Sequence, residues 1–198
     1  MSPGPISRWV LSIVFLLTLG AGVGGKNLLK NGDFEKFNGD EPDGWSTTNI
    51  PKTLTVVSPS TKIHGGKSAV RCEVKTFYGS PLAGMITQKK IPLTGTAITV
   101  SGYYALTSVG KDVGFITFDL QDKEGSNVRN CEQYLAKPTV EYAQFTMSGI
   151  APANAAFLEV RISLLAGEGS ERLHEGSFLL LDDIELTAAS PESQKIVQ

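Results

Sequence analysis

The sequence is poor in the residues that build most catalytic and metal centres. Its 198 residues include only two cysteines and two histidines. Two cysteines are too few for a disulfide-rich miniprotein. The sequence has no CxxC pair, no paired-histidine motif and no GxSxG elbow, which are the motifs expected for thiol redox, zinc and serine-nucleophile chemistry. The chain also lacks a large excess of charge of either sign, because it has 18 Lys and Arg against 20 Asp and Glu. Because there is no basic run, we expect no nucleic-acid partner.

Long hydrophobic runs are also scarce, and the longest lies at the amino terminus. Arg8 precedes the apolar run Trp9 to Leu19, and small residues follow up to Gly25. The run is shorter than the roughly 20 apolar residues that span a bilayer, which favours a secretory signal peptide over a membrane anchor. We therefore expect a signal peptide at 1–25 and a secreted protein, extracellular or periplasmic, with no integral membrane span after cleavage.

Export would allow a disulfide between the two cysteines. Cys72 alternates with Val70 and Val74 and is expected to face a core, whereas Cys131 lies in the more polar stretch 127–133. This pattern is compatible with a disulfide and equally with two free thiols, one buried and one in a loop.

Two-residue alternation of apolar and polar residues recurs along the chain, and no stretch keeps a helical period. It is clearest in 98–106, 115–120 and 157–164, and further strands are expected at 54–57, 68–75, 84–91, 141–149 and 176–187. The residues expected to face a core are Ile98, Val100, Tyr104, Leu106, Ile116, Phe118, Leu120, Leu158, Val160, Ile162 and Leu164. We predict an all-β chain, with one antiparallel two-sheet β-sandwich of jelly-roll type at 26–189 and a loose C-terminal tail at 190–198.

Four short motifs occur in order along this domain. They are Asn27–Glu35 (NLLKNGDFE) followed by Pro42–Trp45 (PDGW), then His64–Ala69 (HGGKSA), Val100–Tyr104 (VSGYY) and Leu181–Leu186 (LDDIEL). Together they resemble carbohydrate-binding modules with a galactose-binding-like jelly roll, and families 4, 9 and 22 are the most similar. The resemblance implies a non-catalytic module that binds a polysaccharide or another glycan, although the same fold also serves other functions.

The resemblance further implies a structural calcium ion that joins the first and last strands. Its ligands would be Glu35, one or both of Asp182 and Asp183, and backbone carbonyls around Gly66. Such hard oxygen ligands suit calcium. In the alternative interpretation, these acids are solvated strand-end residues that bond backbone amides. His64 and His174 are expected to be exposed surface histidines rather than ligands.

Sugars present apolar C–H faces edged by hydroxyls, so a binding surface needs flat rings and polar partners. Candidates on strand faces opposite the core are Tyr103, Phe115, Phe157 and Arg161, with Gln88, Gln133 and Glu159 as hydroxyl partners. These form a glycan groove if their strands are neighbours. Tyr78, next to Phe77, and Tyr134 are loop candidates. Trp45 is either a rim residue or a plug at one end of the sandwich, and we favour the plug.

Two other functions are weighed against glycan binding. An extracellular protein-interaction or cell-surface module would keep the fold motifs and lose the groove, and a flat aliphatic or charged face would favour it. A small glycoside hydrolase needs two converging carboxylates. It is disfavoured because the adjacent Asp182 and Asp183 would point to opposite faces of an extended strand. A concave face with two or more exposed rings would favour sugar.

Overall fold

The computed structural model describes residues 26–48, 55–76 and 82–189. The predicted signal peptide at 1–25, the predicted tail at 190–198 and the candidate Tyr78, with its neighbour Phe77, lie outside these ranges. Within them every regular element is a strand, so no helix long and apolar enough to cross a membrane occurs there.

The strands follow the predicted segments closely, with three short ones near the amino terminus. In chain order they are β1 (Phe37–Asn38), β2 (Glu41–Pro42), β3 (Ser46–Thr48), β4 (Thr55–Ser60), β5 (Ala69–Val74), β6 (Leu82–Pro92), β7 (Ala97–Thr107), β8 (Val113–Gln121), β9 (Asn127–Leu135), β10 (Ala143–Ile150), β11 (Phe157–Leu165) and β12 (Phe178–Ala189). β9 was not predicted, because its side chains are mostly polar and only its last residue, Leu135, is buried.

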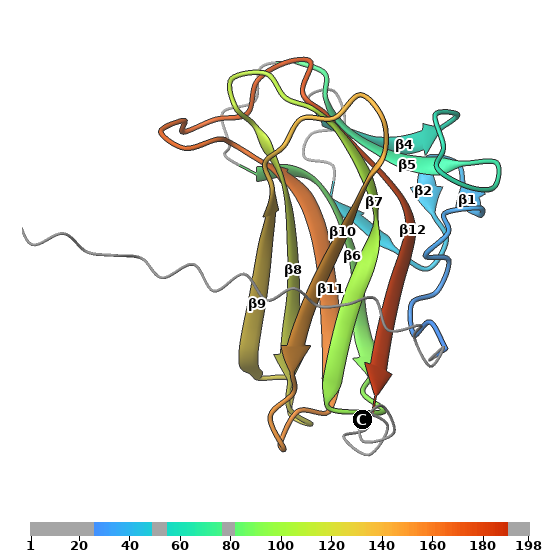
Figure 1. The fold of residues 1–198 in the computed structure, drawn as a ribbon, viewed down its shortest axis with the longest axis vertical. Coiled ribbons are helices and arrows are strands. Elements are labelled where there is room, and N and C mark those ends of the chain that lie inside the picture. The colour runs from blue at the N-terminus through green and yellow to red at the C-terminus, as the bar shows by residue number, and fades with distance from the viewer. Residues whose placement is uncertain (1–25, 49–54, 77–81, 190–198) are drawn as a thin grey trace, which may run out of the picture.

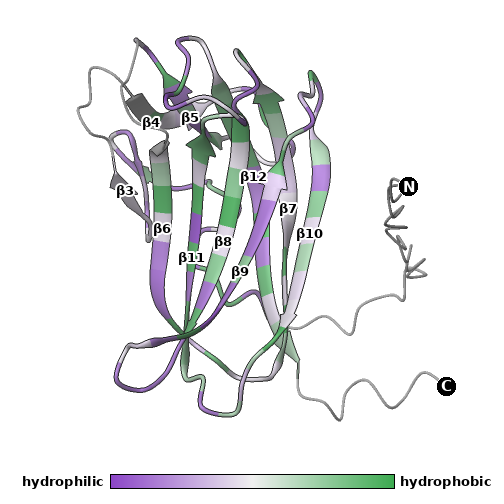
Figure 2. Cartoon of the chain, turned by 90° about the vertical axis from the view of Figure 1, so that its left-hand side faces the viewer, coloured by the Kyte–Doolittle hydropathy of each residue, from purple (hydrophilic) through white to green (hydrophobic). Residues whose placement is uncertain are grey.

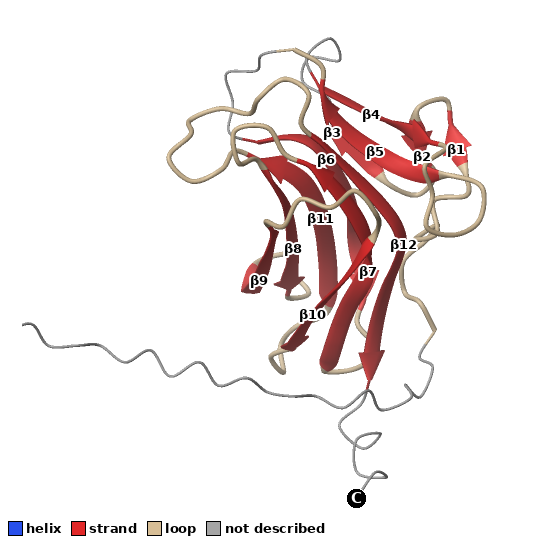
Figure 3. Cartoon of the chain, turned by 45° about the horizontal axis from the view of Figure 1, so that its top comes forward, coloured by secondary structure: helices blue, strands red, loops and turns tan. Residues whose placement is uncertain are grey.

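Ten of these strands form two antiparallel sheets of five strands that pack face to face (Figure 1, Figure 3). One sheet has the order β10-β7-β12-β5-β4 and is called the terminal sheet, because it contains the last strand. The other has the order β3-β6-β11-β8-β9 and is called the groove sheet. β1 and β2 form a separate two-stranded ribbon. The predicted all-β sandwich of jelly-roll type is therefore confirmed.

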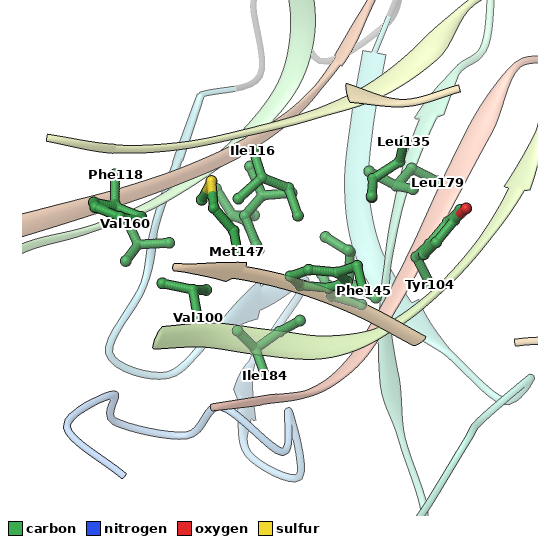
Figure 4. Packing of buried hydrophobic residues seen from close by; sticks show 14 of the residues in the cluster. Val100, Tyr104, Ile116, Phe118, Leu135, Phe145, Met147, Val160, Leu179 and Ile184 are labelled. Atoms are coloured by element: carbon green, nitrogen blue, oxygen red, sulfur yellow. The ribbon is translucent and has the colours of Figure 1, made fainter. Parts of the chain in front are cut away.

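The core lies between the two sheets and is built by the predicted faces of the strands. Val100, Phe145 and Met147 from the terminal sheet meet Ile116 and Phe118 from the groove sheet (Figure 4). Alternation places these apolar side chains on one face of each strand, and burying a side chain of this size contributes about 1.5–3 kcal/mol. All eleven predicted core residues are at most 7% exposed.

The two ends of the described chain run side by side, with the amino-terminal segment next to β12 of the terminal sheet. The Leu28 N–H donates to the Leu186 carbonyl at 2.8 Å, and the Ile184 N–H donates to the Gly32 carbonyl at 2.7 Å. Phe34 and Ile184 are both buried in the shared core. The amino-terminal segment is thereby held against β12 in a single sandwich.

Both cysteines are free, which decides between the two alternatives that the sequence left open. Cys72 lies on β5 in the terminal sheet, and Cys131 lies on β9 in the groove sheet. Burial raises the pKa of the Cys72 thiol to about 12, so this thiol is unreactive at neutral pH.

Candidate functional site

The outer face of the groove sheet carries a small hollow, which we call the groove. It has a volume of about 180 Å³ and is lined by Met85, Phe115, Thr117, Asn130, Glu132, Arg161 and Ser163. These residues come from the neighbouring strands β6, β11, β8 and β9, which stand side by side in Figure 2. Its volume is below the 300–1,000 Å³ of typical small-molecule pockets, so it can surround only a small part of a larger ligand.

Strand register arranges the groove residues in rows that cross the strands. Ser163, Phe115 and Tyr134 face one another in one row. Arg161, Thr117 and Glu132 form the next row, and Glu159, Asp119 and Asn130 form the third. A row with two rings therefore lies beside two polar rows, because paired residues of antiparallel strands point to the same face.

Two aromatic rings stand at one side of the groove. The ring centroids of Phe115 and Tyr134 are 4.9 Å apart, with an interplanar angle of 41°. Tyr134 is 56% exposed, whereas Phe115 is half-buried beside it. The structure thus brings two predicted ligand residues together as a ring pair of which Tyr134 is the exposed member.

Arg161 contacts two carboxylates of the neighbouring polar row. Its guanidinium forms an ion pair with the Asp119 carboxylate, and its Nε lies 3.6 Å from Glu159 Oε1. Asp119 is only 1% exposed and also accepts a hydrogen bond from Asn130 Nδ2 at 2.5 Å. Lys89 Nζ lies 3.6 Å from Glu159 Oε1. These pairings fix polar groups along the sheet face, where a hydroxyl-rich ligand could bond to them.

The sequence missed several groove residues, although a signal for them was present. Thr117 and Asp119 follow Phe115 at positions i+2 and i+4, and Glu132 and Asn130 precede Tyr134 at the same spacing. Residues two apart in a strand share a face, so the predicted rings already implied these neighbours. Their identification failed on the β9 side because β9 itself was not predicted.

Other predicted ligand residues lie away from the groove. Tyr103 is on β7 of the terminal sheet, so its strand is not a neighbour of β8 or β11 and it faces the opposite side of the sandwich. Phe157 lies on the groove sheet but pairs with Gln121 at the far end of β8, outside the groove. Gln133 pairs with Ile116 and faces the core. Among the seven strand-face candidates, only Tyr103 lies on a strand outside the run β6-β11-β8-β9.

Gln88 and Trp45 have structural partners instead of open surfaces. Gln88 is 6% exposed, its Oε1 accepts from the Lys30 N–H at 2.9 Å and its Nε2 donates to the Lys30 carbonyl at 3.0 Å. Its amide thereby holds the amino-terminal segment to β6. Trp45 is 6% exposed and packs against Phe34, with ring centroids 5.4 Å apart. Trp45 is thus the plug that we favoured, not a rim residue.

A second cluster, which we call the clasp, consists of Glu35, Asp182, Asp183 and the loop from His64 to Ser68. Glu35 Oε1 accepts from the N–H groups of Lys67 and Ser68 at 2.7 and 3.1 Å. Asp182 is fully buried, and its Oδ2 accepts from the N–H groups of His64 and Gly65 at 2.8 and 3.1 Å. The amides lower the pKa of Glu35, whereas burial raises the pKa of Asp182.

A β-bulge in β12 directs both aspartates to the same loop. The register shifts between Asp182 and Glu185, and Asp183 has a left-handed φ of 48°. Asp183 Oδ2 lies 2.7 Å from His64 Nδ1, while Asp182 bonds the backbone of the same histidine. The expectation that these adjacent residues point to opposite faces was therefore wrong, because it assumed an unbroken strand.

Both histidines bond a carboxylate. His64 is exposed, as expected, but its ring stacks on Tyr103 with centroids 3.4 Å apart. His174 is half-buried, which differs from the expectation. Its Nδ1 lies 3.0 Å from Oδ1 of the fully buried Asp112, whose Oδ2 also accepts from the Ser177 hydroxyl at 2.7 Å. His64 thus ties its loop to the bulge of β12, and His174 ties its loop to the residue that precedes β8.

The clasp contains the acidic residues that the resemblance assigns as ligands of a calcium ion. Its carboxylates are hard donors of the kind that calcium prefers. Five backbone amides already donate to three carboxylate oxygens, namely Glu35 Oε1, Asp182 Oδ1 and Asp182 Oδ2. Across the described ranges no set of three or more His, Cys, Asp or Glu side chains converges as a metal site. Glu35 and Asp182 thus bond backbone amides, but Asp182 is buried within β12 rather than solvated at a strand end, and Asp183 bonds the ring of His64. The oxygens left for an ion are Glu35 Oε2 and Asp183 Oδ1.

Comparison with known proteins identifies the fold. No family model and no curated protein matches the sequence. Among solved structures, TmCBM61 in complex with β-1,4-galactotriose matches with 17% identity and a TM-score of 0.56, over 83% of this chain and 99% of that one. The CBM22-1 xylan-binding domain of Paenibacillus barcinonensis Xyn10C matches with 13% identity and a TM-score of 0.52, over 85% and 99%.

This chain has the jelly-roll fold of carbohydrate-binding modules. The resemblance to modules of the family 4, 9 and 22 type is thereby supported at the level of the fold, and a family 4 module is also among the matches. A further match is the enzymatically active domain of tailspike protein 4 from bacteriophage CBA120, with 12% identity and a TM-score of 0.61. The match covers 82% of this chain but only 21% of that one, so the likeness does not extend to most of the tailspike domain.

Proposed function

We propose that this jelly roll is a non-catalytic glycan-binding module and that the groove is its binding site. The observation that carries the proposal is the ring pair of Phe115 and Tyr134 beside the Arg161 row, in a hollow on the sheet face. The rings offer apolar faces for the C–H face of a sugar, and the polar row offers partners for its hydroxyls. The matches to modules in complex with galactotriose or described as xylan-binding support this class of ligand.

The small volume of the groove limits how much of a glycan it contacts. A hollow of about 180 Å³ surrounds about one sugar unit, and the rest of a chain must lie along the open sheet face. Individual contacts would then be weak, and useful affinity would come from polymeric ligands or from several modules acting together.

The groove carboxylates support a binding role over hydrolysis. Asp119 is paired with Arg161, and Glu159 lies beside both Arg161 and Lys89. A glycosidase needs one carboxylic acid that keeps its proton in order to protonate the leaving oxygen. Both carboxylates are instead held next to cationic side chains, and in this geometry they are suited to accept hydrogen bonds from hydroxyls.

Secretion and calcium belong to the same proposal. The signal sequence at 1–25 would deliver the module to extracellular or periplasmic glycans. A calcium ion at the clasp would be held by Glu35 and Asp183 and would cross-link the amino-terminal segment to β12, far from the sugar. Its chemistry there is structural, so glycan binding would not depend on direct contact with the ion.

Affinity electrophoresis and a glycan array test the proposal. β-Glucans, xylans, mannans and β-1,4-galactans are compared with the wild type, Tyr134→Ala and two controls, Val140→Ala and Tyr103→Ala. Burying one ring against a sugar contributes about 1.5 kcal/mol or more, so Tyr134→Ala should weaken retention roughly tenfold or more. Val140 is 80% exposed, and Tyr103 lies on the other sheet, so both controls should bind like the wild type.

The outcomes separate glycan binding from its main alternative. Uniform absence of retention, with a cooperative melt that shows a folded protein, would favour the protein-interaction module. Retention that Tyr134→Ala leaves unchanged would keep the function but remove the groove as its site. Retention lost only in Tyr103→Ala would move the site to the terminal sheet.

A further inference from the structure

The charges that face the groove are unevenly paired. Arg161 forms an ion pair with Asp119, and Lys89 and Arg161 both lie 3.6 Å from Glu159. The third carboxylate, Glu132, lines the groove and is exposed, and within the described ranges it forms no ion pair. The groove therefore presents the Glu132 carboxylate to its ligand, while the lining cation in the same row, Arg161, is paired with Asp119.

A second acceptor lies in the same row. Thr117 pairs with Glu132 in the strand register and is only 5% exposed. Its Oγ1 is buried without a hydrogen-bond partner. A hydroxyl left unpaired in this way costs roughly 1–3 kcal/mol, so it would gain from a donor supplied by a ligand.

The ring pair adds a third feature that favours positive charge. Tyr134 follows Glu132 by two residues on the same face of β9, so their Cα atoms are about 7 Å apart along the strand. A sugar unit stacked on Tyr134 would therefore hold its ring substituents above Glu132 and Thr117. The faces of Tyr134 and Phe115 also attract a cation within about 6 Å.

We infer that the groove selects a sugar unit that carries a protonated amine. Glu132 and Thr117 would accept the ammonium N–H groups, and the ring pair would contact the C–H face of the same unit. This inference rests on the proposed function and adds the class of sugar. A neutral sugar would leave Glu132 without a counter-charge, and an acidic sugar would meet it with like charge.

The test compares three β-1,4-linked hexasaccharides with one backbone, made of glucosamine, N-acetylglucosamine or glucose. Their dissociation constants are measured by NMR titration of the full-length mature protein at a pH where the amine is protonated. An exposed ion pair and a cation–π contact each contribute modestly, so we expect the glucosamine hexamer to bind about three- to tenfold more tightly than the glucose hexamer. The titrated amide signals should include those of β8 and β9.

Two charge-matched variants separate the groove from general attraction. Glu132→Gln should bring the glucosamine-to-glucose ratio close to one, because it should weaken binding of the glucosamine hexamer more than binding of the glucose hexamer. Glu124→Gln removes the same charge from the exposed turn between β8 and β9 and should keep the wild-type ratio. This control matters because the chain carries a formal net charge of −2, which attracts any polycation.

The titrations of the three hexamers and the two variants can overturn the inference in three ways. A wild-type ratio of one or below, an equal fall in both variants, or no titration with any of the three hexamers would overturn it. Retention of neutral glycans in the array would then show that the proposed function stands without the amine preference. If the array and all three hexamers fail together, the proposed function fails with it.

Discussion

Glu35 and Gly66 lie so close that the carboxylate oxygen Oε1 of Glu35 occupies the space where a side chain at position 66 would begin. Gly66 also has a left-handed φ of 63°. Two features therefore require a glycine at position 66, namely its left-handed backbone conformation and the close approach of the Glu35 carboxylate. This contact holds the loop from His64 to Ser68 against the end of the amino-terminal segment.

Substitution of Gly66 by alanine should open the clasp. The left-handed conformation alone costs about 1–2 kcal/mol for a residue with a Cβ, and overlap with Glu35 adds to that cost. Gly39→Ala is a matched control, because Gly39 has the same φ of 63° and nothing lies within 4 Å of the place that its Cβ would take. Urea unfolding should show a larger loss of stability for Gly66→Ala, whereas equal losses would contradict a role for the carboxylate contact.

Acid should weaken the clasp through Glu35. The Lys67 and Ser68 amides lower the pKa of this carboxyl below its ordinary value of 4.5. Its stabilising effect is therefore fully present above pH 4.5 and is lost as the pH falls through the lower pKa of the folded state. Glu35→Gln keeps the acceptor but cannot titrate, so the difference in melting temperature between wild type and variant should shrink between about pH 6 and pH 3.

The buried Asp182 is present in both the wild type and Glu35→Gln, so its titration cancels from the difference in melting temperature between the two proteins. Its raised pKa has the opposite sign, because a group that holds its proton more tightly when folded loses stabilisation as the pH rises. A difference for Glu35→Gln that stays flat with pH would rule out the amide bonds as the cause.

Calcium should stabilise the fold without being required for it. Five amides already close the clasp, so the protein should remain folded in chelator. At a hundredfold excess over its dissociation constant, an ion bound only to the folded state adds about 2.7 kcal/mol, or roughly 5–10 °C in melting temperature for a domain of this size. Identical melts in calcium and in chelator would remove the proposed ion, and Asp183→Asn should reduce any shift.

Loss of the Arg161 guanidinium should destabilise the groove sheet. Asp119 would stay buried without its cation, and breaking a buried ion pair in this way costs about 3–5 kcal/mol. The double variant Arg161→Met/Asp119→Asn should recover part of that loss, because the buried charge is gone. Arg129→Met is the control, since Arg129 is exposed and donates to the Ile150 carbonyl. If the double variant were no more stable than Arg161→Met, the ion pair would not be the source of the loss.

The strands could be predicted because one face of each is buried. Alternation along 98–106, 115–120 and 157–164 correctly assigned every core residue named from those segments. The same rule failed for β9, where only Leu135 is buried and polar residues occupy both faces. Without β9, the positions of Glu132 and Asn130 in the groove could not be deduced.

The sequence pattern of a single strand could not predict which of the two sheets that strand joins. Tyr103 and Phe115 have equivalent positions relative to their core faces, yet β7 pairs with β10 and β12, whereas β8 pairs with β9 and β11. Most of these pairings join strands that are distant in sequence, and nothing in the alternation of a single strand specifies them. The bulge at Asp182–Glu185 was hidden for a similar reason, because it depends on how β12 meets β7.

The pairing of Leu28 with Leu186 places the entry and exit of the described chain next to each other along β12, and the bonds between Lys30 and Gln88 place the same segment beside β6. Neighbouring termini let a domain be inserted into a surface loop of a host protein with little distortion. A host joined through these residues would therefore stand near β6 and β12, whereas the ring pair lies on β8 and β9, toward the other edge of the groove sheet. Fusion of this unit to a reporter at either end should accordingly preserve access to the hollow.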